Sequence, residues 1–425
     1  MSRTAEAVLV LATTGLAVFG VLLVNFAEGT YLNRQAALTI LVFGVVFGGL
    51  LTAVHRWASG SVPYLIPLAA TLTAVGFVMI YRLDHDLAGQ QSWWIMFSAG
   101  LAALALFRLQ KRGVASLRPF GWVCLAAAVL FLALPAIPAV APPLHGTSPT
   151  GPTWRWATEI VFRSGEIARL LLVIFLASYL ADRQSSLTTG VRTIGRFRLP
   201  EFGALLPMGL ACLAALGVLV YENDLGASLL LFGLFPIMFY IATNRPTYLT
   251  IGFGVYALGL AGAVLLDPGV RGSMGAWLRP WTDDTEVGSQ IVQSLFALAA
   301  GSISGTGPGL GEPDLVPTAA TSHLFAAVAE ELGLAGSIVV LAAYVLLVAT
   351  GFGIALRSRD LFSKLLASGL SLLLGLQTVL LLAGLVRLLP PSSLLAPFMS
   401  YGGASSVAAF VWLALLARVS HEERT

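Results

Sequence analysis

The chain has 425 residues, of which 57% are hydrophobic and only 11% are charged, and its mean hydropathy is +0.86. Soluble domains have about 25% charged residues, so this composition excludes an ordinary soluble enzyme. Apolar runs of about 20 residues are long enough to cross a bilayer as helices. We therefore predict an all-α polytopic membrane protein. We attribute the net charge of +3 to loop residues that orient the membrane spans. No nucleic acid is therefore expected among the partners.

Hydrophobic runs predict about twelve transmembrane helices, with ends defined to within a few residues. They are expected at residues 6–26, 35–54, 63–82, 92–107, 119–141, 166–182, 201–221, 225–243, 247–266, 320–350, 365–388 and 402–419. No small-residue cleavage motif follows the first run, which is therefore predicted to be a retained span. The first two spans carry almost no polar residues. We expect residues 1–60 to form an appended two-helix hairpin on a transmembrane core of residues 61–425.

The distribution of basic residues predicts the orientation of these spans. If the N-terminus is cytoplasmic, the inner segments carry about two thirds of the 24 Lys and Arg residues. This bias predicts that both termini lie in the cytoplasm. The polar stretch of residues 267–323 then faces outward.

This stretch, residues 267–323, is the longest polar break in the hydrophobic pattern. Loops of this length in a compact bundle are usually functional or disordered, and its aromatic and apolar content argues against disorder. We therefore expect a large extracellular loop that carries the active site. Its candidate site residues are Arg279, Trp281, Asp283, Gln290, Gln293 and Ser294. The span that follows is too long for one straight crossing, so a break is expected near Gly333 or Gly336.

Polar residues near other helix ends add further candidates for substrate binding. Glu166 and Arg169 are three positions apart and share one helix face, where they form either a structural ion pair or part of the site. A Pro/Gly-rich start to the last span is tolerated at membrane depth only where it is buried or lines a cavity. The last outer loop and this helix start contribute Arg387, Ser400, Tyr401 and Ser405.

Four sequence blocks resemble the SEDS family (shape, elongation, division and sporulation), which includes RodA and FtsW. PFMSYGGASS at residues 397–406 is similar to the family signature near the C-terminus. Residues 315–336, which end in AEELGLAG, and the turn DLGA at residues 224–227 resemble two further family blocks. WTDDTEVGSQIVQSLFALAAG at residues 281–301 resembles the pattern W-x-D-P-x-G-x-G-Y-Q-x-x-Q-S. The N-terminal hairpin is most similar to that of actinobacterial RodA-type members.

The resemblance implies a peptidoglycan glycosyltransferase that polymerises lipid II at the outer face of the cytoplasmic membrane. It also implies a single-pass class B penicillin-binding protein, a transpeptidase, as partner. The family's catalytic aspartate falls on Asp283, and its helix-opening glutamate and lysine fall on Glu166 and Arg169. Because lipid II carries an α-linked diphosphate and the polymer is β-linked, one inverting displacement is implied, without a covalent enzyme intermediate.

The residue chemistry agrees with this reaction. A carboxylate can take the proton from the acceptor hydroxyl. The departing diphosphate needs positive charge, which an arginine or a divalent cation such as Mg²⁺ or Mn²⁺ could supply. No metal site held by protein ligands alone is predicted.

Several polar positions of the site depart from the family pattern. Asp284, Glu286 and Ser289 replace a proline, a glycine and a tyrosine, and Ser322-His323-Leu324 replaces Thr-Asp-Phe. These departures motivate an alternative, a catalytically weak or inactive scaffold or regulator that binds a class B penicillin-binding protein. A transporter of lipid-linked precursors is disfavoured, because the inner halves of the spans show almost no charged residues.

Overall fold

The computed structural model describes residues 3–29, 34–134, 164–189, 191–194, 197–200, 209, 225–283 and 285–424. Its elements in chain order are α1 (Arg3–Ala27), α2 (Arg34–Trp57), α3 (Leu65–Leu83), α4 (His85–Arg112), η1 (Val114–Phe120), α5 (Gly121–Ala133), α7 (Gly165–Thr189), β1 (Val191–Ile194), β2 (Phe197–Pro200), α9 (Leu225–Thr243), α10 (Thr247–Leu266), α11 (Pro268–Leu278), η3 (Pro280–Thr282), α12 (Glu286–Gly301), η4 (Pro313–Leu315), α13 (Leu324–Arg357), α14 (Leu361–Leu385) and α15 (Gly403–Glu422). Within the described part, nine helices are long and apolar enough to cross a membrane.

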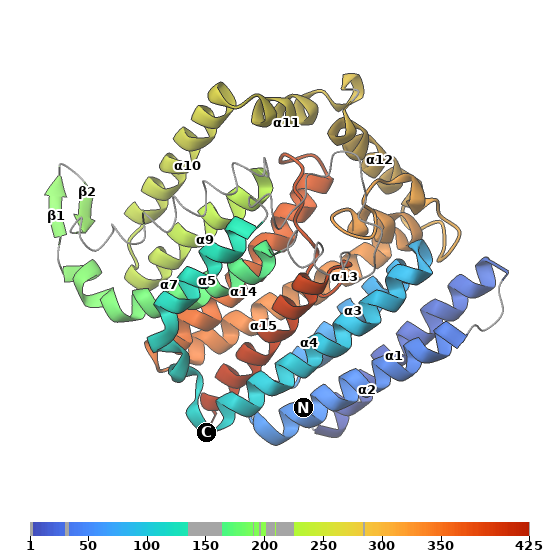
Figure 1. Ribbon diagram of the computed structural model, residues 1–425, viewed down its shortest axis with the longest axis horizontal. Helices are drawn as coiled ribbons and strands as arrows, with labels where there is room; N and C mark the ends of the chain where they lie inside the picture. Colours follow the sequence, from blue (N-terminus) through green and yellow to red (C-terminus); the bar gives the residue numbers. More distant parts are fainter. Residues whose placement is uncertain are drawn as a thin grey trace.

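These helices form a bundle with two distinct ends. Both chain termini lie at one end, and α11 lies at the opposite end, where it spans the distance between α10 and α12 (Figure 1). The interior of the bundle contains α7, α14 and α15, whose Leu172, Leu366 and Leu416 are 0% exposed. The helices α1 and α2 lie along the outside of the bundle, against α3 and α4 (Figure 1). The polar stretch predicted to carry the site is therefore far from the termini.

The helical fold class is confirmed, but two details differ from the expectation. Residues 267–323 are not a simple loop, because α11, α12 and two short 3₁₀ turns form within them. The strands β1 and β2 pair in an antiparallel hairpin and are the local exception to an all-α chain. The predicted span at residues 201–221 lies almost entirely outside the described residues, so the number of about twelve spans stays a prediction.

The predicted break in the long span is present at Gly333. Its backbone is non-helical, with φ of 66° and ψ of −169°, and it divides α13. The loop after α12 satisfies the backbone groups beside the break. The N–H of Leu334 donates to the carbonyl of Ser302 at 3.0 Å, and the N–H of Gly307 donates to the carbonyl of Glu331 at 3.0 Å. A break at membrane depth is tolerated because this loop covers it.

Arg82 of α3 anchors the same loop from the other side. Its Nη2 donates to the carbonyl of Gly311 at 3.1 Å, and its Nε lies 3.3 Å from Oε1 of Glu331. The other carboxylate oxygen of Glu331 accepts the N–H of Gly309 at 2.9 Å. Glu28 at the end of α1 lies 3.8 Å from Arg82. This cluster joins the N-terminal hairpin, α3 and α13 at the end of the bundle that carries α12.

The segment before α15 packs tightly against α3 and α4. A Cβ added at Gly76 would collide with the backbone of Met399, and one at Gly403 would collide with the ring of Trp94. Overpacking of this kind costs about 1–3 kcal/mol and occasionally more. We therefore expect Gly76→Ala to lower the thermal unfolding temperature of the purified protein in detergent. Gly100→Ala is the matched control, because nothing lies within 4 Å of that added Cβ; equal unfolding temperatures for the two variants would contradict the packing described here.

Candidate active site

Asp283 lies directly before α12, and its carboxylate is held by the residue that caps this helix. Thr285 donates its N–H to Oδ1 at 3.1 Å and its hydroxyl to Oδ2 at 2.9 Å. A Cβ added at Gly288 would lie 2.9 Å from Cβ and 3.2 Å from Cγ of Asp283, so glycine there lets the first turn of α12 approach the carboxylate. Asp283 is only partly buried. Its carboxylate is thus fixed in place while remaining accessible to a substrate.

The other predicted residues of this stretch lie along η3 and α12. Trp281 is 60% exposed, and its ring packs edge-on against Phe296 with the centroids 5.7 Å apart. Gln290 and Gln293 are partly exposed. Ser294 is 1% exposed and donates to the carbonyl of Gln290 at 2.8 Å, which satisfies its hydroxyl within the helix. Trp281 and the two glutamines are therefore better placed than Ser294 to meet a ligand.

Arg387 is joined to the end of α11. Its Nε donates to the carbonyl of Trp277 at 3.0 Å and its Nη2 to the carbonyl of Leu278 at 2.7 Å. The indole N–H of Trp277 donates in return to the carbonyl of Arg387 at 3.3 Å. These bonds satisfy carbonyls at the C-terminal end of α11, which have no partner within the helix. Arg279, the next residue after α11, is exposed.

An apolar groove lies beside Trp277. It has a volume of about 270 Å³ and is formed between α9, α10, α11 and α14. Its lining includes Leu229, Tyr256, Met274, Trp277 and Leu380. The lining is apolar, so the groove suits a hydrocarbon chain better than a sugar.

Glu166 and Arg169 form a buried ion pair in the interior of the bundle. Nη1 of Arg169 lies 2.7 Å from Oε1 of Glu166, and both residues are less than 10% exposed. Gln377 of α14 donates through Nε2 to both carboxylate oxygens at 3.1 Å and to the carbonyl of Leu395 at 2.8 Å. Among the described residues, Nε of Arg169 has no hydrogen-bond partner. A small cavity of about 30 Å³ is lined by Glu166, Gln377 and Ser405, which brings this predicted serine next to the ion pair.

Ser400 and Tyr401 hold the segment before α15 in place. The hydroxyl of Ser400 accepts the N–H of Ala396 at 2.9 Å and donates to the carbonyl of Thr321 at 2.6 Å. The hydroxyl of Tyr401 donates to Oε1 of Gln90 at 2.8 Å. These contacts link the segment to α4 and to the chain just before α13.

His323, one of the departures from the family pattern, is buried beside two hydroxyls. Its Nδ1 lies 3.0 Å from Oγ1 of Thr318 and 3.1 Å from Oγ of Ser322. Burial lowers the pKa of His323 from 6.5 to about 4. The folded protein therefore holds this imidazole neutral at pH values where the unfolded chain would protonate it.

This shift predicts a loss of stability in mild acid. Because the folded pKa lies below the unfolded one, the unfolded state binds the extra proton as the pH falls from about 6.5 to about 4. We expect His323 to lower the free energy of unfolding by up to about 3 kcal/mol across this window. The difference in unfolding temperature between wild type and His323→Asn, measured from pH 7 to pH 4.5, reports this contribution. A difference that does not change with pH would contradict it.

The described residues offer little for a metal site built by the protein alone. Within the described ranges, no three His, Cys, Asp or Glu side chains come together to hold a metal ion. Asp284 and the side chain of Glu286 lie outside those ranges. Mg²⁺ is commonly bound through one or two carboxylates together with substrate phosphates. Asp283 could contribute one such carboxylate when a diphosphate is present.

Comparison with known proteins decides the family. The family model of FtsW, RodA and SpoVE, described as a cell cycle protein, matches residues 63–425. The chain belongs to the FtsW/RodA/SpoVE family. It is 38% identical over 395 residues to the peptidoglycan glycosyltransferase RodA of Mycobacterium tuberculosis, covering 90% of this chain and 83% of that protein.

Solved structures of FtsW/RodA/SpoVE-type proteins share the fold. A chain from a peptidoglycan synthase complex, solved to show how polymerization and crosslinking are coordinated, has a TM-score of 0.63 at 25% identity and covers 85% of this chain and 98% of its own. The crystal structure of the Rod shape determining protein RodA of Thermus thermophilus has a TM-score of 0.55 at 25% identity. The match covers 86% of this chain and 97% of the Thermus thermophilus chain. Like other members of the family, this chain is a multi-pass helical membrane protein.

The structure groups the predicted site residues of this FtsW/RodA/SpoVE member into separate neighbourhoods. Asp283 and Trp281 lie before α12, Arg387 follows α14 and contacts the end of α11, and Glu166 and Arg169 lie inside the bundle. Sequence reasoning missed two kinds of partner. These are Gln377, which bridges Glu166 to a backbone carbonyl, and Thr285 with Gly288, which hold and accommodate Asp283. Gln377 could have been found as a single polar amide inside an apolar span, because polar groups at membrane depth usually face a partner.

Proposed function

We propose that the chain is a peptidoglycan glycosyltransferase that polymerises lipid II at the outer face of the cytoplasmic membrane. The observation that carries the proposal is the accessible carboxylate of Asp283, fixed by Thr285 at the start of α12. The relatives named peptidoglycan glycosyltransferase, at 38% identity, support the substrate class. The basic residues of the loops support an orientation with both termini in the cytoplasm. The end of the bundle that carries α11 and α12 would then face outward (Figure 1).

In the proposed reaction, Asp283 acts as general base. It accepts the proton of the acceptor sugar hydroxyl as the oxygen attacks the anomeric carbon of the donor. The bond from that carbon to the diphosphate breaks at the same time, so the configuration inverts and the polyprenyl diphosphate leaves with its electron pair. Both carboxylate oxygens accept hydrogen bonds from Thr285, which fixes their direction. Fixing the base in this way replaces part of the ordering that the transition state requires.

Positive charge near the reacting diphosphate would stabilise its departure. Arg279 is exposed and lies four residues before Asp283. Arg387, in contrast, already donates two hydrogen bonds to carbonyls at the end of α11. Arg169 is buried in its pair with Glu166 but has an unpartnered Nε among the described residues. We therefore propose Arg279 as the arginine that binds the diphosphate. A divalent cation bound to the substrate phosphates would supply further positive charge.

The lipid part of the substrate also has a candidate location. The groove of about 270 Å³ is lined by Trp277 and Met274 of α11 and by residues of α9, α10 and α14. Trp277 lies six positions before Asp283 in the chain. A polyprenyl chain in the groove would bring its diphosphate toward the C-terminal end of α11, which Arg279 follows. A class B penicillin-binding protein is the proposed partner, in line with the synthase complex to which the fold is similar.

The scaffold alternative rests on the changed polar positions, among which His323 is buried and titratable. Its buried, neutral ring bonded to two hydroxyls shows that this change fits a stable local structure. The two functions are separated by assaying the purified protein, with and without its transpeptidase partner, for release of polyprenyl diphosphate from lipid II. Release together with a lysozyme-sensitive polymer supports the transferase. Partner binding without any release supports the scaffold.

A further inference from the structure

A cavity lined by several charged residues lies at the opposite end of the bundle from Asp283 (Figure 1). It has a volume of about 650 Å³ and is formed by the start of α1, the turn between α2 and α3, the last turns of α13 and the end of α15. This is the end that carries both termini (Figure 1). The proposed glycosyltransferase reaction does not use it.

Three arginines line this cavity, one from each of its main walls. They are Arg3 of α1, Arg357 of α13 and Arg424, which follows α15. Within the described ranges, their guanidinium groups make no hydrogen bond and no ion pair. The lining also holds two carboxylates, Glu6, which is paired with His55 at 2.8 Å, and Glu423. Three arginines against two glutamates give the lining a net positive charge.

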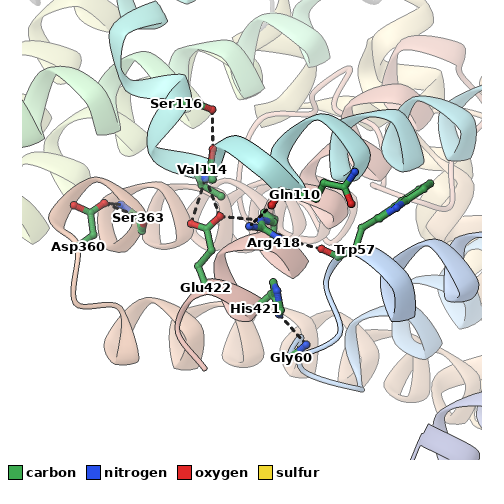
Figure 2. A network of polar contacts seen from close by, with 11 residues as sticks. Trp57, Gly60, Gln110, Val114, Ser116, Asp360, Ser363, Arg418, His421 and Glu422 are labelled. Carbon is green, nitrogen blue, oxygen red and sulfur yellow. Dashed lines mark hydrogen bonds and ion pairs between the residues drawn. The ribbon is translucent and has the colours of Figure 1, made fainter. Parts of the chain in front are cut away.

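A neighbouring arginine shows what a structural role looks like at this end of the bundle. Arg418 donates to Glu422 at 2.7 Å and to the carbonyls of Trp57 at 3.0 Å and Gln110 at 3.4 Å (Figure 2). Glu422 in turn accepts the N–H of Val114 at 2.9 Å. This network fastens α15 to α2, α4 and η1. The three cavity arginines take no part in such a network, and all three are exposed, so their guanidinium groups are accessible to a ligand.

The two helices α1 and α13, which form walls of the cavity, also expose apolar side chains. Leu346 of α13 belongs to the cavity lining and is exposed, and the exposed side chains of Val345, Val339 and Ile338 continue along the same helix. Leu9 and Leu16 of α1 are exposed as well. A ligand that fits both the cavity and these side chains has an anionic head and hydrocarbon chains. Hydroxyls of Ser59, Ser61 and Thr350 in the lining can donate to phosphate oxygens.

We propose that this cavity binds the phosphodiester head group of an anionic phospholipid, with its acyl chains along α1 and α13. Basic pockets between transmembrane helices are suited to such head groups, and arginine matches phosphate geometry through paired N–H groups. The lipid would join the N-terminal hairpin to the core, because Arg3 belongs to the hairpin and Arg357 to α13. The site is separate from the groove beside Trp277 that we propose for the lipid-linked substrate.

The test measures lipid binding rather than activity. The full-length protein in detergent is titrated with phosphatidylglycerol or phosphatidylcholine, and bound lipid is counted by native mass spectrometry. We expect phosphatidylglycerol to be preferred, and Arg357→Gln or Arg424→Gln each to weaken its binding about fivefold. Arg357→Lys should retain part of the affinity, because the charge remains. Arg359→Gln is the matched control, since Arg359 is exposed two positions further on but does not line the cavity.

Three results would overturn the proposal. One is equal binding of phosphatidylglycerol and phosphatidylcholine. The second is an equal loss of binding in the Arg359→Gln control and in the cavity variants, which would indicate nonspecific attraction to basic residues. The third concerns the source of the phosphate and uses the unfolding temperature of the protein with each ligand. If inorganic phosphate raises the unfolding temperature as much as phosphatidylglycerol does, and Arg357→Gln abolishes this rise, the cavity binds free phosphate and not a lipid. If Arg357→Gln fails to fold, Arg424→Gln carries the test, because it lies beyond the last helix.

Discussion

Asp283→Asn is expected to lower the rate of lipid II polymerisation by about 10²- to 10⁴-fold, the usual contribution of a general base. Asparagine has nearly the same shape and can still accept the N–H of Thr285 through its side-chain oxygen. It cannot accept the proton of the attacking hydroxyl. The loss should therefore appear in kcat, with little change in the apparent affinity for lipid II. Initial rates over a range of lipid II concentrations measure both quantities.

Glu312→Gln is the matched control for this variant. It removes a carboxylate that is exposed in the same stretch of residues 267–323, outside α11 and α12. Its polymerisation rate should stay close to that of wild type. A rate for Asp283→Asn that also stays close to wild type, in protein with an unchanged unfolding temperature, would rule out Asp283 as the base.

Arg169→Met is expected to destabilise the protein by about 3–5 kcal/mol, because it leaves the carboxylate of Glu166 buried without its partner. The side chain of Glu166 is 10% exposed, and Gln377 is the neighbour that still donates to it. Methionine has a volume similar to arginine but no charge. The effect should appear as a lower unfolding temperature and a lower yield of folded protein from the membrane.

A double-mutant cycle separates the charge effect from simple packing. Glu166→Gln combined with Arg169→Met removes both charges, and we expect it to recover much of the stability lost in Arg169→Met alone. Arg279→Met is the control, because Arg279 is exposed and its removal should change stability by no more than about 0.5 kcal/mol. Additive losses in the double variant would show that Glu166 and Arg169 are not coupled, against the 2.7 Å contact.

Much of the fold could be predicted because hydrophobic length governs structure in a membrane. The spans expected at residues 225–243 and 247–266 coincide with α9 and α10 to within a residue, and the break at Gly333 followed from the excessive length of one apolar run. The helices inside residues 267–323 were not delimited in advance, although Gln290, Gln293 and Ser294 stand at helical spacing and Asp267 and Thr285 cap α11 and α12. α11 is only 11 residues long and is also held by tertiary contacts such as that of Arg387 with Trp277.

The candidate site was predictable in its residues but less so in their contacts. The pair of Glu166 with Arg169 stands out as two charges at the start of an apolar span. Asp283 is one of several acidic residues in residues 267–323, and the family resemblance singled it out. The function of Arg387 as a cap for α11 could not be read from the sequence, because its partners lie about 110 positions away. Gln377 likewise meets Glu166 only through the packing of α14 on α7. Contacts between distant segments depend on the packing of whole helices, which periodicity does not specify.

The central claim, that this chain itself joins lipid II units, is tested most directly by a polymerisation assay on the purified protein. Labelled lipid II is incubated with the wild-type chain and its class B penicillin-binding protein, and the products are separated by gel electrophoresis beside those of Asp283→Ala. We expect a ladder of glycan strands from wild type and none from Asp283→Ala. An absence of polymer from wild type, with the partner bound and with the Mycobacterium tuberculosis relative active in parallel, would contradict the claim and leave the chain as a scaffold.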